Sequence, residues 1–104
     1  MTLLEKQFKF TNAISFLIRY AFENGYFLTF GDCYRDKRCP YGHPQSNHRK
    51  RLAVDFNLFI DGEYIQDSDH PAWEELHKEW KRLGGAKMIA GDANHFSFKY
   101  AGIV

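Results

Sequence analysis

Two histidines and two carboxylates offer the side-chain types of a hydrolytic metal centre. His48 precedes Asp55 by seven residues, and Asp92 precedes His95 by three. Two imidazoles and one carboxylate form a ligand set that catalytic zinc uses, and the fourth position is then left for water. We therefore predict one Zn²⁺ per chain, bound by His48, Asp55 and His95. Asp92, three residues before the last ligand, is the predicted general base.

A second metal site can also be assembled from the sequence. It would be a structural zinc site made of Cys33, Cys39, His43 and His48. Its five-residue gap between the cysteines is wider than the two to four residues that zinc sites usually have, so it ranks second. For His70 and His77 we expect cap or surface roles, although His77 repeats at helical spacing with Trp73 and Trp80.

The composition is that of one folded domain without an obvious polyanionic partner. The chain has 104 residues, of which 44% are hydrophobic and 17% aromatic, too many large apolar groups for a disordered chain. Fourteen basic and thirteen acidic residues leave a net charge of +1. The local basic runs at 35–38 and 49–51 are typical of a solvated loop. We predict a single domain over residues 1–104, with no nucleic-acid partner.

Neither a leader nor a membrane span is predicted. The first residues lack a basic region followed by an apolar stretch and a cleavage site. No apolar run approaches the roughly 20 residues of a membrane helix. We expect a monomer that is synthesised in the cytoplasm without a signal peptide and does not insert into a membrane. Its two cysteines are expected to stay reduced.

Hydrophobic periodicity and turn residues divide the chain into two helices and four strands. The expected order is a helix over 3–23, a strand over 26–30, a long loop over 36–47, a strand over 52–60, a return strand over 63–65, a helix over 71–83 and a strand over 95–100. Thr2 and Glu5 form a capping box at the start of the first helix. The apolar positions expected on its buried face are Leu3, Leu4, Phe8, Ile14, Leu17, Ile18, Ala21 and Phe22.

This order predicts an α+β fold, with a small antiparallel sheet and two main helices on one side of it. The strand over 52–60 is the expected centre of the sheet, because it is long and apolar and Asp61-Gly62 turns it into a hairpin. A central strand gives Asp55 the rigid support that a metal ligand needs.

The ligand motifs also resemble those of a known family. Ser46-x-His48, Ala53-x-Asp55 and Asp92-x-x-His95-Phe96 are similar to the motifs of the D-alanyl-D-alanine metallopeptidase family. That family includes VanY-type D,D-carboxypeptidases and phage L-alanyl-D-glutamate endolysins, and it is related to lysostaphin and hedgehog-type zinc domains. The segments 23–26, 31–35 and 52–62 resemble it as well, so the resemblance extends over about residues 8–98.

The resemblance implies a role for each matched residue. His48, Asp55 and His95 would bind the zinc, and Asp92 would be the catalytic base. Arg35 matches an arginine that lies near the substrate and stabilises the oxyanion, although a solvated loop charge is its alternative. Ser46 matches a residue that flanks the site, where it contacts substrate or makes a plain loop hydrogen bond. One position departs from the pattern, because Arg51 stands where the family usually has glycine, four residues before Asp55.

The implied activity is that of a zinc peptidase that hydrolyses peptidoglycan. Its substrate would be the stem peptide, cut at an L-Ala–D-Glu bond or at a terminal D-Ala–D-Ala bond. A chain without a predicted signal peptide resembles a phage lysin, which acts on the cell wall after its release. The alternative is a non-catalytic, metal-stabilised domain that binds the cell wall or serves a structural role.

Overall fold

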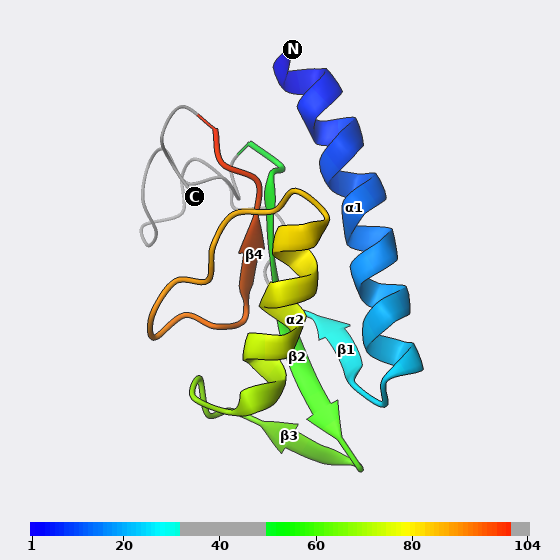
Figure 1. The fold of residues 1–104 in the computed structure, drawn as a ribbon, viewed down its shortest axis with the longest axis vertical. Coiled ribbons are helices and arrows are strands. Elements are labelled where there is room, and N and C mark those ends of the chain that lie inside the picture. Colours follow the sequence, from blue (N-terminus) through cyan, green and yellow to red (C-terminus); the bar gives the residue numbers. More distant parts are fainter. Residues whose placement is uncertain (32–49, 101–104) are drawn as a thin grey trace.

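The computed structural model describes residues 1–31 and 50–100. Their elements follow in the order α1 (Leu3–Glu23), β1 (Phe27–Phe30), β2 (Ala53–Ile60), β3 (Glu63–Ile65), α2 (Pro71–Arg82) and β4 (His95–Ser97). The predicted α+β class, with a small antiparallel sheet and two helices, is confirmed (Figure 1). The expected loop over 36–47 lies outside the described residues.

Strand β2 is the centre of the sheet, as predicted. It pairs antiparallel with β1 along Phe56–Phe59, with β3 along Leu58–Ile60 and with β4 along Ala53–Asp55. Strands β3 and β4 follow one another along the same side of β2, opposite β1 (Figure 1). The last strand is shorter than the predicted 95–100, because its ladder with β2 ends at the pair Ala53–Ser97.

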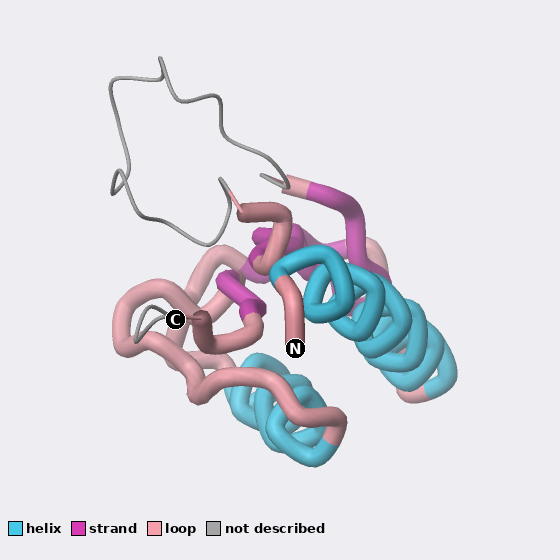
Figure 2. Tube along the Cα trace, turned by 90° about the horizontal axis from the view of Figure 1, so that it is seen from above, coloured by secondary structure: helices cyan, strands magenta, loops and turns pink. Residues whose placement is uncertain are grey.

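Both helices cover one face of this sheet (Figure 2). Val54, Phe56 and Leu58 of β2 are buried, whereas the residues between them are half-buried. Alternate residues of a strand point to opposite faces. The even-numbered side chains of β2 therefore join the core beneath the helices, and Asp55 and Asn57 belong to the other face.

Helix α1 begins and ends where the sequence predicted. Thr2 accepts a hydrogen bond from the backbone N–H of Glu5, whose side chain accepts one from Thr2 in return. The predicted buried face is wrong in part: Leu4, Phe8 and Phe22 are exposed. The buried residues of the helix are Phe10, Ala13, Ile14, Leu17 and Ala21. Because α1 has apolar residues around much of its circumference, its periodicity alone did not fix which side packs against the sheet.

Helix α2 begins at Pro71, as predicted, and ends one residue earlier than expected. The expected cap role of His70 is confirmed, because its Nδ1 accepts a hydrogen bond from the backbone N–H of Ala72 at 3.0 Å. Trp80 at the other end is completely buried and donates from Nε1 to the carbonyl of Ser97 at 3.0 Å. This bond ties α2 to the end of β4.

Candidate metal centre

The fold brings together two of the three predicted ligands. Asp55 on β2 and His95 on β4 are directly opposite one another in the antiparallel ladder, although forty residues separate them in sequence. The Nδ1 of His95 lies 3.2 Å from the Oδ1 of Asp55. His95 is buried and the Asp55 side chain is 17% exposed. The pair therefore lies on the face of the sheet away from the helices, still open to solvent at the carboxylate.

The backbone at Asp55 is held from both sides. The N–H of Gly31, just after β1, donates to the carbonyl of Asp55 at 2.7 Å, and β4 pairs with the other side. A Cβ at Gly31 would lie 3.1 Å from that carbonyl oxygen. A glycine at this position thus lets the end of β1 approach Asp55 closely. This contact holds the part of β2 that carries the Asp55 carboxylate.

The separation of the pair is close to that of two ligands of one zinc ion. Zinc binds imidazole nitrogen and carboxylate oxygen at about 2.0–2.2 Å, and tetrahedral angles then place two ligand atoms about 3.3–3.6 Å apart. The observed 3.2 Å is slightly shorter than that range. It is also at the long end of the range for an N–H···O hydrogen bond, so the pair can hold together without metal.

The other predicted site residues have different outcomes. His48, Arg35 and Ser46 lie outside the described residues, and so do Cys33, Cys39 and His43 of the alternative zinc site. Within 1–31 and 50–100, no three His, Cys, Asp or Glu side chains gather closely enough to bind a metal ion. The structure thus brings two of the three predicted ligands side by side and does not describe the third.

Asp92 lies in the turn that leads into β4. Its carbonyl accepts a hydrogen bond from the backbone N–H of His95 at 3.1 Å, and its own N–H donates to the carbonyl of Ile89 at 3.0 Å. The side chain is exposed. The turn therefore connects the predicted base directly to the predicted ligand, and any shift of this turn moves both.

His77 of α2 supports the same turn from the helix side, and the expected surface role for it is wrong. The side chain is only 6% exposed, its Nε2 lies 2.7 Å from the carbonyl oxygen of Ala93, and its ring stacks on Phe96 with 4.0 Å between centroids. The sequence contained a signal for this burial, since Trp73, Leu76, His77 and Trp80 repeat at the spacing of one helix face.

Burial favours the neutral form of His77. It lowers the pKa of the imidazole below the ordinary value of 6.5, and the nearby His95 adds to the lowering, while the carbonyl of Ala93 and the carboxylate of Asp92 oppose it. A neutral ring whose Nε2 lies against a carbonyl oxygen carries its proton on Nε2 and donates there. His77 therefore donates a buried hydrogen bond to the residue between Asp92 and His95.

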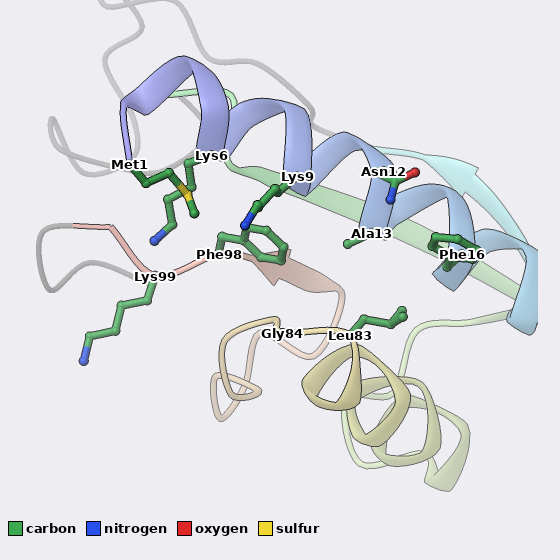
Figure 3. A pocket seen from close by; sticks show the side chains of 10 residues that line it. All are labelled: Met1, Lys6, Lys9, Asn12, Ala13, Phe16, Leu83, Gly84, Phe98 and Lys99. Atoms are coloured by element: carbon green, nitrogen blue, oxygen red, sulfur yellow. The ribbon is translucent and has the colours of Figure 1, made fainter.

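A hollow elsewhere in the molecule contains less suitable chemistry. It has a volume of about 560 Å³ and lies between α1 and the turn after α2 (Figure 3). Lys6, Lys9 and Lys99 surround an apolar floor that includes Phe98. Among the residues that the structure describes, no carboxylate, histidine or cysteine lines it. The Asp55–His95 pair is therefore the better candidate for a reactive centre among the described residues.

Comparisons with known proteins add no family assignment. Neither a scan against protein-family models nor a search of curated proteins finds a match for the chain. Among the helices described, none is long and apolar enough to cross a membrane.

Proposed function

We propose that the chain is a zinc-dependent peptidase that hydrolyses an amide bond in peptidoglycan stem peptides, at an L-Ala–D-Glu or a D-Ala–D-Ala bond. The single observation that carries this proposal is the 3.2 Å approach of Asp55 and His95 on paired strands. The motif resemblance implies, from sequence context alone, that these two residues are zinc ligands. His48 is proposed as the third ligand.

The backbone at Arg51 offers separate support. Arg51 has a φ of +56°, in the left-handed region that favours glycine. The family that the chain resembles usually has glycine at this position, where this chain has arginine. The turn into β2 thus has the backbone conformation for which a family glycine would be suited, four residues before the proposed ligand Asp55.

The chain's own residues would divide the chemistry. Zinc, when bound, would act as a Lewis acid and lower the pKa of a coordinated water towards about 7. Asp92 would accept the proton of the attacking water and return it to the leaving amine. Arg35 would stabilise the charge that develops on the carbonyl oxygen, and Ser46 would contact the substrate. Asp92 would stay close to the centre, because its carbonyl accepts a hydrogen bond from the N–H of His95 three residues later.

Digestion of purified peptidoglycan tests this proposal. The purified full chain is expected to release stem-peptide fragments that mass spectrometry identifies, and a chelator is expected to stop the release until zinc is restored. The fragment masses name the bond. Metal binding without any cleavage would instead favour the non-catalytic wall-binding alternative.

The Asp92→Asn variant tests the assignment of the base. Turnover is expected to fall by about 10²- to 10⁴-fold, while the zinc content stays at that of the wild type. Asp61→Asn is the matched control, because Asp61 is exposed in the β2–β3 turn and has a positive φ that asparagine tolerates. Undiminished activity in Asp92→Asn would remove Asp92 from the mechanism.

A further inference from the structure

A polar notch adjoins the Asp55–His95 pair. Strands β3 and β4 lie along the same side of β2, but β4 pairs only as far as Asp55 and β3 begins to pair at Leu58. Beyond Asp55, the N–H of Phe56 still donates to the carbonyl of Asn94, and the gap that remains at Asn57 opens into a hollow of about 290 Å³. Trp73 at the start of α2 and Asn94 before β4 complete its walls.

Neutral hydrogen-bonding groups line this notch. They are the carboxamides of Asn57, Gln66 and Asn94 and the hydroxyls of Tyr64 and Ser68. No charged side chain is among the described residues that line it. The Tyr64 hydroxyl donates to Oδ1 of Asn57 at 3.3 Å, and within residues 1–31 and 50–100 the side chains of Gln66, Ser68 and Asn94 make no hydrogen bond. These groups are therefore available to a ligand.

The lining selects the kind of group that can enter. Each carboxamide offers both donors and an acceptor, so together they can satisfy a group that also has one of each. A secondary amide is such a group. A carboxylate or an ammonium would lose part of its hydration against a neutral lining and an aromatic base, without an opposite charge to compensate. The notch thus suits an uncharged amide and disfavours a free chain end.

The notch is placed to receive the part of a substrate next to the reactive centre. Asn94 directly precedes His95, and Asn57 is two residues beyond Asp55 on the same face of β2. Two residues of a strand span about 6.6 Å. An extended peptide covers about the same length with two residues. A substrate whose scissile carbonyl lies at Asp55 and His95 can therefore place a neighbouring amide in the notch.

We propose that this notch is a substrate subsite that binds a secondary amide beside the scissile bond, an inference that rests on the proposed peptidase function. In peptidoglycan such an amide comes either from the stem-peptide backbone or from the acetamido group of a glycan sugar. The subsite recognises the amide by its paired donor and acceptor, through Gln66, Asn94 and the side-chain N–H groups of Asn57, which make no hydrogen bond within the described residues.

Binding measurements on the zinc-loaded Asp92→Asn protein test the subsite without turnover. The two probes are the pentapeptide L-Ala-γ-D-Glu-L-Lys-D-Ala-D-Ala and the N-acetylglucosamine trimer, each followed by calorimetry and by the side-chain amide signals in NMR. Gln66→Met and Asn94→Leu, each added to this protein, keep the approximate side-chain size and remove the hydrogen-bonding groups. Asn12→Leu is the matched control, because Asn12 is exposed on α1.

Each notch variant is expected to raise the Kd of one probe by about five- to tenfold, while Asn12→Leu leaves it unchanged. A change for the pentapeptide identifies the backbone amide, and a change for the trimer identifies the acetamido group. Equal Kd values in the notch variants and the control, or no binding of either probe at millimolar concentration, would overturn the subsite.

The two proposals fail separately. If the wild type cleaves peptidoglycan but the notch variants bind both probes normally, the subsite is wrong and the peptidase function stands. If the wild type cleaves nothing but the trimer binds through Gln66 and Asn94, the peptidase function is wrong and an amide-binding notch remains. Because Gln66 is exposed, Gln66→Met is expected to fold, and its unfolding curve verifies this.

Discussion

Replacement of His77 by phenylalanine isolates one hydrogen bond that holds the turn before β4. Phenylalanine preserves a planar ring against Phe96, which lies 4.0 Å away with an interplanar angle of 7°. It removes the donor that lies 2.7 Å from the carbonyl of Ala93. Since Ala93 is 2% exposed, water cannot easily replace that donor. The change therefore leaves a buried acceptor without its partner.

The expected cost follows from this burial. Leaving one buried polar group without a partner lowers the free energy of unfolding by about 1–3 kcal/mol. For a domain of this size, each kcal/mol corresponds to about 4–8 °C in Tm. His77→Gln is the complementary variant, because its amide can donate to Ala93 while it gives up the stacked ring, which is worth about 0.5–1.5 kcal/mol.

Urea unfolding and amide hydrogen exchange measure the effect. In His77→Phe, the His95 amide, which donates to the carbonyl of Asp92, is expected to exchange faster than in the wild type. His77→Gln is expected to protect this amide better than His77→Phe does. A stability loss below about 0.5 kcal/mol in His77→Phe, with unchanged exchange at His95, would refute the supporting role of His77.

Two further predictions concern the scaffold. Tyr26 donates to Glu75 at 2.6 Å, and this hydrogen bond raises the pKa of the phenol above 10.0. The bond therefore adds stability below pH 10, and this stability is lost as the pH rises through the folded-state pKa. Between pH 8 and 11, the free energy of unfolding is expected to fall less steeply with pH in Tyr26→Phe than in the wild type. An equal decrease in the two proteins would contradict this. A Cβ at Gly85 would lie 2.1 Å from Nε1 of Trp80, so Gly85→Ala is expected to cost about 1–3 kcal/mol, whereas the exposed Lys87→Ala is expected to cost little. Equal stability of these two variants would show that the turn has room for a side chain.

Local signals in the sequence predicted the helices and the centre of the sheet. The capping box at Thr2 and the Asn24-Gly25 stop define both ends of α1, and Pro71 marks the start of α2. The hairpin turn was predicted because Asp61 and Gly62 favour the positive φ values that they adopt, 51° and 80°. These features depend on residues close together in the chain, which is why sequence alone identifies them.

Packing between residues far apart in the chain was harder to predict from the sequence. The approach of Asp55 and His95 depends on the register of β4 against β2, which no local pattern states. The burial of His77 was missed because we weighed its polar side chain above its position on an apolar helix face. The burial of Phe10 was missed because α1 has apolar residues around much of its circumference. The gap between β3 and β4 likewise arises from pairing over a distance, so the polar notch had no counterpart in the sequence.

The most direct test of the proposed metal centre is the zinc content of the purified chain after dialysis, measured by plasma mass spectrometry for the wild type and for His95→Ala. The wild type is expected to retain one zinc per chain, and His95→Ala, which removes one partner of the 3.2 Å pair, is expected to retain almost none. A wild type without zinc, or one full equivalent in His95→Ala, would contradict a metal centre at Asp55 and His95.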